Sequence, residues 1–267
     1  MVRPVALVNG TESTLDQANL SILDAGVQRG DGAFEAIGIW DGRPFRLDDH
    51  LERLDRSLAA IGLPPAPADA MRADIARVLD GQTGDGALRV FLTSTDSRIV
   101  VVSEPPIRKQ LRRLSSQPAP WIRPLGTYGP AAAKTMSYSP NMTASRAAQR
   151  AGADDALLIS LEGLVLEGPT FSVMWVRDGR IHAPALDLGL VDSISRRTVL
   201  ELATEMEIEH ETGRYGLDDL RDADEVMTSS AVRPLVPLEA VDDHKLPADA
   251  PITTRLAEGL VARRRAA

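Results

Sequence analysis

The chain has 267 residues, of which 43% are hydrophobic and 25% charged, a balance typical of a globular protein with room for two packed units. A net charge of −8 with only 4% aromatic residues argues against nucleic acid as a partner, and the lack of cysteine with four widely spaced histidines argues against a metal site. We find no basic-then-apolar leader and no apolar run near the ~20 residues that span a bilayer, so we expect a cytoplasmic protein without membrane contact.

The N-terminal half is predicted to be α+β. Strand composition recurs in four segments, 5–8, 33–40, 88–92 and 99–102. The Asp41-Gly42 dipeptide after the second of these is a strong hairpin signal. Apolar residues at helical spacing predict two helices, one from an Asp48 or Asp49 cap to residue 61 and one over 71–79.

A stretch rich in Ser, Pro and Gly follows between residues 115 and 130, which is typical of a connector. We therefore predict a small N-terminal domain over 1–116, a linker over 117–130, and a larger C-terminal domain over 131–267. In the last of these, helices are predicted at 140–151, 194–206 and 252–264, and strands at 156–161, 164–166, on both sides of Asp178-Gly179, and at 225–230 and 235–241.

Lys134 follows three alanines and a Gly-Pro turn. Burial among small apolar residues disfavours the charged form of a lysine amine, which then becomes a nucleophile able to form a Schiff base. A solvated surface lysine is the commoner case for such a local sequence. The residues that accompany Lys134 along the chain favour the first interpretation.

A pyridoxal phosphate enzyme needs an amine, an acid against the pyridine nitrogen, and amide donors with a cation for the phosphate. Lys134 offers the amine, and Glu167 offers the acid. Ser193-Ile194-Ser195 opens a predicted helix whose amides and dipole favour an anion, and Arg53 can add a bidentate contact. Each has an ordinary alternative: helix-capping serines, a turn carboxylate and a solvated helix arginine.

Six separated motifs then occur in one order over nearly the whole chain. They are Gly30-Asp31-Gly32-Ala33-Phe34-Glu35, Asp48-Asp49-His50-Leu51-Glu52-Arg53-Leu54, Lys134 with Tyr138, Asp155-Ala156-Leu157-Leu158 leading to Glu167-Gly168, Ile194-Ser195-Arg196, and Ala223-Asp224-Glu225-Val226 with Ser229-Ser230. Together they resemble the class IV aminotransferases, the fold type IV pyridoxal phosphate enzymes. That group includes branched-chain and D-amino acid transaminases, R-selective amine transaminases and aminodeoxychorismate lyases. The resemblance implies a small α+β domain, a larger barrel-like α/β domain, and a homodimer with sites at its interface.

The resemblance also implies roles for individual residues. Lys134 is the Schiff-base lysine, Glu167 the partner of the pyridine nitrogen, Arg53 a phosphate ligand, Ile194 and Ser195 the phosphate-binding amides, and Tyr138 a neighbour of the phenolic oxygen. Several positions depart from the common pattern. The run Pro169-Thr170-Phe171-Ser172 follows Glu167-Gly168 where many relatives have an asparagine, and Ser195 replaces a threonine but keeps a hydroxyl. Ser193 stands where many members have glycine, and Ala231 stands where transaminases often have threonine, which leaves Ser230 as the hydroxyl donor.

An amino acid or 2-oxo acid substrate needs a cation for its carboxylate, and three arginines are candidates. By resemblance, Arg29 and Arg98 fall near pocket positions of D-amino acid transaminases, and Arg89 falls near an arginine of the branched-chain enzymes. Each can equally be an exposed strand-edge arginine. The expected partners are an amino acid or primary amine as donor and a 2-oxo acid as acceptor.

The sequence gives opposing signals about the reaction. The stretch 230–238 is more similar to the lyases, which release pyruvate and 4-aminobenzoate from aminodeoxychorismate. Lyases commonly have a threonine just after the position of Glu35, however, and the methyl group of Ala36 cannot relay a proton. The prediction is a transaminase, with the lyase as the alternative and a non-catalytic relative that binds in the same cleft as a third.

Overall fold

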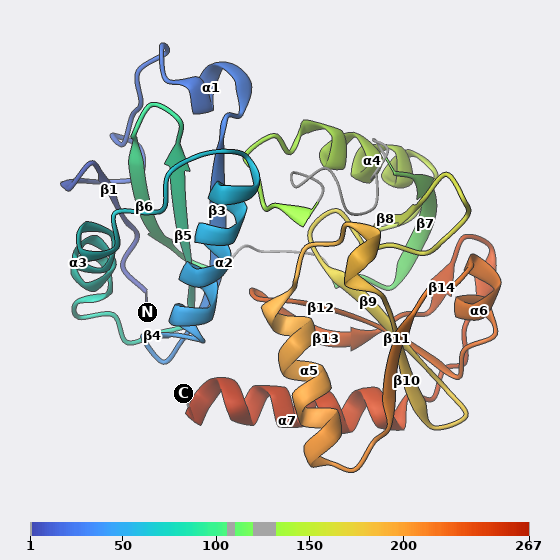
Figure 1. Cartoon of the computed structure of the whole chain (residues 1–267). Coiled ribbons are helices and arrows are strands. Elements are labelled where there is room, and N and C mark those ends of the chain that lie inside the picture. Colours follow the sequence, from blue (N-terminus) through green and yellow to red (C-terminus); the bar gives the residue numbers. More distant parts are fainter. Residues whose placement is uncertain (1, 106–109, 120–131, 267) are drawn as a thin grey trace. The chain divides into compact units, whose positions relative to one another are not determined.

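The computed structural model describes residues 2–105, 110–119 and 132–266, and these fall into two compact units (Figure 1). The first unit contains residues 2–105, 132–138 and 264–266, and the second contains 110–119 and 139–263. The sequence placed Lys134 in the C-terminal domain and residues up to 116 in the N-terminal one. The contacts instead group Lys134 with the first unit and strand β7 (Arg113–Pro118) with the second. Most of the predicted linker lies outside the described residues.

A six-stranded antiparallel sheet forms the first unit, in the order β2-β1-β6-β5-β3-β4. Its strands are β1 (Val5–Val8), β2 (Thr11–Ser13), β3 (Gly32–Trp40), β4 (Arg43–Pro44), β5 (Gly86–Thr93) and β6 (Arg98–Ser103). The predicted hairpin joins β3 to β4, with positive φ at Asp41 (50°) and Gly42 (80°) as a two-residue turn requires. A Cβ on Gly42 would lie 2.0 Å from the Gln82 carbonyl oxygen, so only glycine fits there.

Three helices belong to this unit, α1 (Ala25–Arg29), α2 (Leu47–Ala60) and α3 (Ala68–Leu79). Helices α2 and α3 cover one face of the sheet, where their apolar side chains meet those of the strands (Figure 1). The predicted cap of α2 is wrong, because the helix begins at Leu47 after Arg46, whose φ is 54°. Asp48 and Asp49 instead lie in the first turn, where carboxylates suit the helix dipole.

The second unit contains two sheets. One has the order β11-β10-β9-β12-β13, from β11 (His210–Gly213), β10 (Arg180–Pro184), β9 (Ser172–Arg177), β12 (Glu225–Ser230) and β13 (Arg233–Pro237). The other has the order β15-β14-β7-β8, from β15 (His244–Lys245), β14 (Ala240–Val241), β7 and β8 (Asp155–Ile159). The helices are α4 (Ser139–Arg150), the short 3-10 helix η2 (Leu186–Leu188), α5 (Ile194–Glu205), α6 (Leu217–Arg221) and α7 (Pro251–Ala266).

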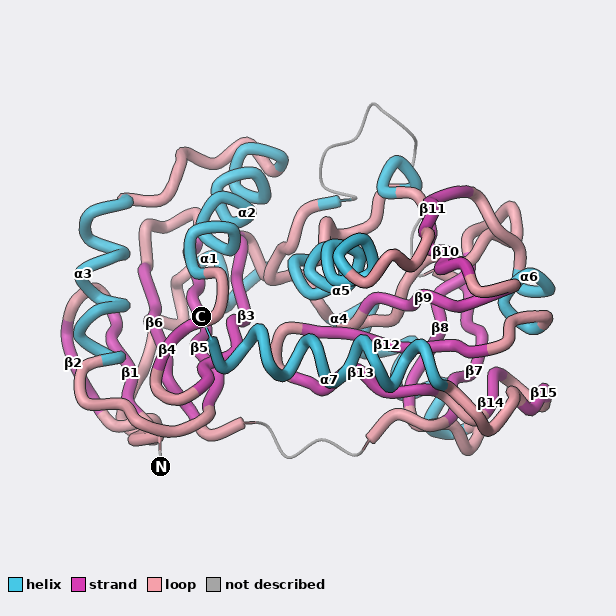
Figure 2. The backbone as a smooth tube through the Cα atoms, turned by 90° about the horizontal axis from the view of Figure 1, so that it is seen from below, coloured by secondary structure: helices cyan, strands magenta, loops and turns pink. Residues whose placement is uncertain are grey.

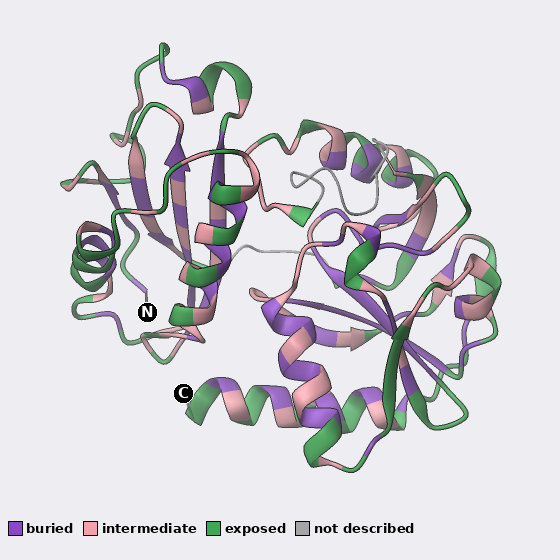
Figure 3. Cartoon of the chain, in the orientation of Figure 1, coloured by how far each residue is buried: buried purple, intermediate pink, exposed green. Residues whose placement is uncertain are grey.

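Side-chain alternation along β9 shows how these elements are layered. Met174 and Val176 pack with α5 and α7, while Val173 and Trp175 pack with residues of β7, β8 and β14. Figure 2 shows α7 running along β12 and β13. The other side of β8 is covered by α4. Because both faces of β9 and β12 are covered, these strands are buried almost throughout (Figure 3).

Several predicted elements differ from the structure. Strand β7 lies in the Ser- and Pro-rich stretch that was interpreted as connector. Leu164 and Val165 form isolated bridges rather than a strand, and the predicted strand at 235–241 is divided between β13 and β14. In the described ranges, no helix is both long and apolar enough to cross a membrane. The same ranges contain no group of three or more His, Cys, Asp or Glu side chains placed to hold a metal ion.

Candidate active site

The backbone around Lys134 is fixed from two sides within the first unit. The Phe34 amide donates to the Lys134 carbonyl at 3.0 Å, and the Met136 amide donates to the Gly32 carbonyl at 2.8 Å. The Lys134 amide in turn donates to Ser57 Oγ of α2 at 3.1 Å. The lysine is therefore attached to the start of β3 and to α2, although it is about a hundred residues from β3 along the chain.

The amine of Lys134 lies against aromatic rings. Its Nζ is 4.3 Å from the ring centroid of Phe34 and 5.5 Å from that of Tyr138, and these two rings meet edge to face. Phe34 also stacks on Phe91 at 5.7 Å. The side chain is half-buried. The amine is thus in contact with aromatic rings, whose faces also attract a cationic amine.

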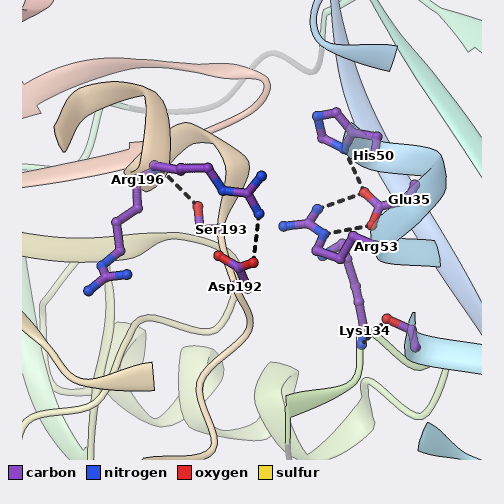
Figure 4. A network of polar contacts seen from close by, with 9 residues as sticks. Glu35, His50, Arg53, Lys134, Asp192, Ser193 and Arg196 are labelled. Atoms are coloured by element: carbon purple, nitrogen blue, oxygen red, sulfur yellow. Dashed lines mark hydrogen bonds and ion pairs between the residues drawn. The ribbon is translucent and has the colours of Figure 1, made fainter. Parts of the chain in front are cut away.

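Helix α2 presents three buried polar side chains on one face. His50, Arg53 and Ser57 are spaced by three and four residues and are 1%, 7% and 3% exposed. Arg53 makes a bidentate contact with the carboxylate of Glu35 on β3. Its Nε donates to Oε1 and its Nη2 donates to Oε2, both at 2.7 Å. His50 Nδ1 lies 2.8 Å from the same Oε2 (Figure 4). Arg53 is therefore not a solvated helix arginine.

The charges of this cluster explain its protonation. Burial alone would raise the pKa of Glu35, but the charge and hydrogen bonds of Arg53, with the hydrogen bond of His50, lower the pKa of that carboxyl to about 2. Burial lowers the pKa of His50 and outweighs its contact with Glu35. His50 is thus neutral near pH 7 and donates its Nδ1–H to the ionised Glu35.

The three candidate substrate arginines lie in different surroundings. Arg89 pairs with Ala36 across β5 and β3, on the sheet face that also holds Phe34 and Phe91. Arg98 lies on β6 with its guanidinium held by the buried Asp74 of α3 at 2.6 Å, so it is not an exposed edge arginine. Arg29 is exposed at the end of α1. Arg89 alone of the three shares a sheet face with the ring beneath the lysine amine.

In the second unit, Glu167 lies beside the chain that leads into α5. Its side chain is buried, and its Oε1 accepts a long hydrogen bond from the Val191 amide at 3.5 Å. Its carbonyl accepts from the Leu158 amide of β8. The glutamate and the start of α5 are therefore neighbours, although 26 residues separate Glu167 from Ser193.

Helix α5 begins at Ile194, and Ser193 is its N-cap, with Oγ accepting from the Arg196 amide at 3.2 Å (Figure 4). Its φ of −71° shows that a serine fits where many relatives have glycine. Ile194 and Ser195 follow at the positive end of the helix dipole. Arg196 is buried and donates to the Pro184 carbonyl, and burial lowers its pKa against the opposing charges of Asp192 and Glu167.

Ser230 and Ala231 lie where β12 turns into β13. Ser229 of β12 pairs with Ser172 of β9, so this turn is at the same end of the sheet as the Gly168–Phe171 bridge. Arg233 reaches back over the Phe171 ring, with its guanidinium carbon 5.7 Å from the centroid. The second unit thus gathers three of the predicted segments, around Glu167, Ser193 and Ser230.

Sequence reasoning missed the supporting residues. Glu35, His50 and Ser57 were not assigned roles, although the last two lie three residues before and four after Arg53. That spacing was the available signal, because it places His50 and Ser57 on the same side of a helix as Arg53. The partner of Arg53 on β3 could not be deduced from spacing.

Comparison with known proteins agrees with this arrangement of motifs. Residues 32–241 match the family model described as amino-transferase class IV. An aminodeoxychorismate lyase from Bacillus subtilis is 27% identical and covers 88% of this chain and 86% of its own. A fold IV transaminase from Curtobacterium pusillum superposes with a TM-score of 0.89 at 30% identity, covering 97% of this chain and 99% of its own. A hypothetical aminotransferase from Mycobacterium tuberculosis, in a PLP-bound form, gives 0.88 at 25% identity, covering 98% and 99%.

Proposed function

The chain belongs to the class IV aminotransferase family, and from this premise we propose that it is a pyridoxal phosphate-dependent transaminase that moves an amino group between an amino acid or primary amine and a 2-oxo acid. The observation that carries the proposal is the placement of Lys134. Its backbone is hydrogen-bonded to β3 and α2 while its amine lies over Phe34 and near Tyr138. The half-buried amine is packed against these rings and is not surrounded by water on all sides.

The residues present fit pyridoxal phosphate, which supplies an electron sink for the carbon that loses its proton. Lys134 Nζ is the amine that holds the aldehyde carbon. Arg53 is a permanently charged group for the phosphate, and the start of α5 at Ile194 and Ser195 offers amides and a dipole for the same dianion. Ser230 and Ala231 are proposed to add a hydroxyl and a backbone amide. Tyr138 is proposed to approach the phenolic oxygen.

Glu167 is proposed to hold the proton on the pyridine nitrogen. Its carboxylate is buried and interacts electrostatically with Arg196. The amine of Lys134 is proposed as the base that takes a proton from the α-carbon of the donor and returns it. One amine can therefore serve both half-reactions.

The lyase remains the second candidate function. The similarity to the Bacillus subtilis lyase and the lyase-like sequence after Ser230 favour it. Ala36 favours the transaminase, because its methyl group offers no hydroxyl for a proton relay. Ala36 lies on the same sheet face as Phe34, opposite Arg89 of β5.

For the substrate carboxylate we favour Arg89 among the three arginines. Arg89 lies on the Phe34 face of the sheet, whereas the guanidinium of Arg98 is paired with Asp74.

We also propose a homodimer. The apolar side chains of Ile22 and Leu23, which precede α1 and are each 74% exposed, support this proposal. Sedimentation at several concentrations tests that proposal. The cytoplasmic location stays a prediction.

The function is tested with purified protein loaded with pyridoxal phosphate. Borohydride reduction followed by peptide mass spectrometry should find the cofactor on Lys134, and Lys134→Ala should show none. Amino donors of each hand and simple primary amines, added without a 2-oxo acid, should remove the visible absorption band, and a 2-oxo acid should restore it. Consumption of aminodeoxychorismate to 4-aminobenzoate, with no donor changing the band, would establish the lyase instead.

A further inference from the structure

We propose that Glu35 is a positioning residue for the cofactor phosphate, acting by fixing the guanidinium of Arg53. This inference rests on the proposed function, in which Arg53 binds the phosphate. Glu35 itself is 0% exposed and lies on the core face of β3, so it is assigned no contact with substrate.

The contact between the two residues fixes the orientation of the guanidinium as well as its charge. Glu35 accepts from Nε and from Nη2 of Arg53, both at 2.7 Å, which is the two-point geometry that a planar guanidinium makes with a carboxylate. Two parallel hydrogen bonds define the plane of the guanidinium and its rotation within that plane. The direction of the third nitrogen, Nη1, is thereby set by Glu35.

His50 completes the fixation from the helix side. Its Nδ1–H donates to Glu35 Oε2, the oxygen that also accepts from Arg53 Nη2. The carboxylate is therefore held by two residues of α2 three positions apart and cannot rotate without breaking three hydrogen bonds. Since His50 is neutral, the cluster contains one negative and one positive charge.

Burial explains why Arg53 needs this partner. Arg53 is only 7% exposed and so loses most of its hydration, and a buried cation is tolerated only where an anion and hydrogen-bond acceptors replace water. A phosphate supplies that replacement only when it is bound. Glu35 supplies it at all times, so the arginine is already oriented before the phosphate arrives.

The test compares two ligands that differ only in the phosphate, pyridoxal phosphate and pyridoxal, each titrated into the full-length protein freed of cofactor. Glu35→Gln keeps the shape of the side chain but removes its charge and one acceptor. We expect about a tenfold loss of affinity for pyridoxal phosphate and less than a twofold change for pyridoxal. A purely structural role for Glu35 would weaken both ligands alike.

Two further variants keep the test decisive if the glutamine protein folds poorly. Glu35→Asp retains the charge but withdraws the carboxylate by one methylene, and should lose part of the same phosphate preference. In an Arg53→Ala background, Glu35→Asp should cause no additional loss, because its effect passes through the arginine. Asp74→Asn is the matched control, since Asp74 is also a buried carboxylate paired with an arginine, and it should leave the preference unchanged.

The outcomes separate this proposal from the proposed function. If the unaltered protein binds pyridoxal phosphate no better than pyridoxal, or attaches neither to Lys134, the proposed function fails. If Arg53→Ala removes the preference while both Glu35 variants keep it, the function stands and the positioning role of Glu35 is refuted.

Discussion

The two faces of β3 carry different kinds of side chain although the residues alternate along one strand. Glu35 points into the core beneath α2, where it joins Arg53 and His50. Phe34 and Ala36, its immediate neighbours, are half-buried on the opposite face with Arg89 and the amine of Lys134. The core face fixes an arginine by ionic contacts, and the opposite face carries aromatic rings and cationic side chains.

This difference shows how a single strand can serve both stability and chemistry. Side chains of a strand alternate between faces, so a register slip of one residue would bring Glu35 to the opposite face and Phe34 into the core. The eight paired positions of β3 and β5, from Gly32 to Ile39, oppose such a slip. Substitutions on the core face should therefore change stability most, and those on the opposite face should change substrate binding.

The largest effect is expected on the core face. Glu35→Gln removes the anion that compensates buried Arg53, and breaking a buried pair from one side should lower the free energy of unfolding by about 3–5 kcal/mol. Asp74→Asn should cost less, about 1–2 kcal/mol, because Arg98 remains 18% exposed and can reach water. Urea denaturation measures both, and equal losses would contradict the distinction between the two pairs.

Acid should lower the free energy of unfolding that the Glu35, Arg53 and His50 cluster contributes. The pKa of Glu35 is about 2 in the fold against 4.5 for the free residue, so its stabilisation is complete above pH 4.5 and is lost as the pH falls toward 2. That shift corresponds to about 3 kcal/mol. His50 affects stability at higher pH. Because its pKa is lowered in the fold, the unfolded state takes up a proton first as the pH falls below 6.5, and this uptake favours unfolding. Unfolding free energies measured from pH 7 to 3.5 should fall in both windows, and Glu35→Gln should flatten the lower one.

On the opposite face, Arg89→Ala should raise the Michaelis constant for a 2-oxo acid by about tenfold, as expected for loss of one charge-assisted contact. Arg98→Ala is the control and should leave that constant unchanged, since its guanidinium is held by Asp74. Steady-state kinetics with several 2-oxo acids measures both. A rise for Arg98→Ala alone would return the carboxylate site to that residue.

The smallest effect is expected at the junction of the two faces. Ser57→Ala leaves the Lys134 amide without its acceptor and should cost about 1 kcal/mol of stability with a few-fold loss of turnover. Ser137→Ala is the control. Ser137 lies three residues after Lys134, and its exposed hydroxyl donates to the Gly30 carbonyl rather than accepting from the lysine backbone. It should change stability by less than about 0.5 kcal/mol. Equal effects on turnover would show that Ser57 is not special.

Sequence patterns predicted most of the regular elements because they depend on local signals. The hairpin at Asp41-Gly42, the helix at 194–206 and the strand at 225–230 have their own turn, cap or composition, and the structure has all three. Strand β7 was missed because its strand character comes from pairing with β8 and β14, which lie far along the chain. Its Ser- and Pro-rich composition carries no such information.

The residues of the candidate site likewise fall into those that the sequence could predict and those that only the folded structure brings together. Lys134, Glu167 and the start of α5 were named from motif order, which the sequence displays directly. The attachment of the lysine segment to β3, and the pairing of Arg53 with Glu35, join residues brought together only by folding. The three substrate arginines could not be ranked from sequence, since only the strand register separates Arg89 from Arg98.

The last turn of α7 has a consequence for how the protein is made. Arg265 pairs with Asp85 and Asp41, and Arg264 lies over the Trp40 ring, so residues 264–266 belong to the first unit. A ribosome synthesises them after the entire second unit. The six-stranded sheet is therefore synthesised early, but its contacts with residues 264–266 can form only after the second unit has been made. Until then Trp40 lacks its contact with Arg264. A pause in translation before residue 264 would leave that indole without its arginine on the nascent chain.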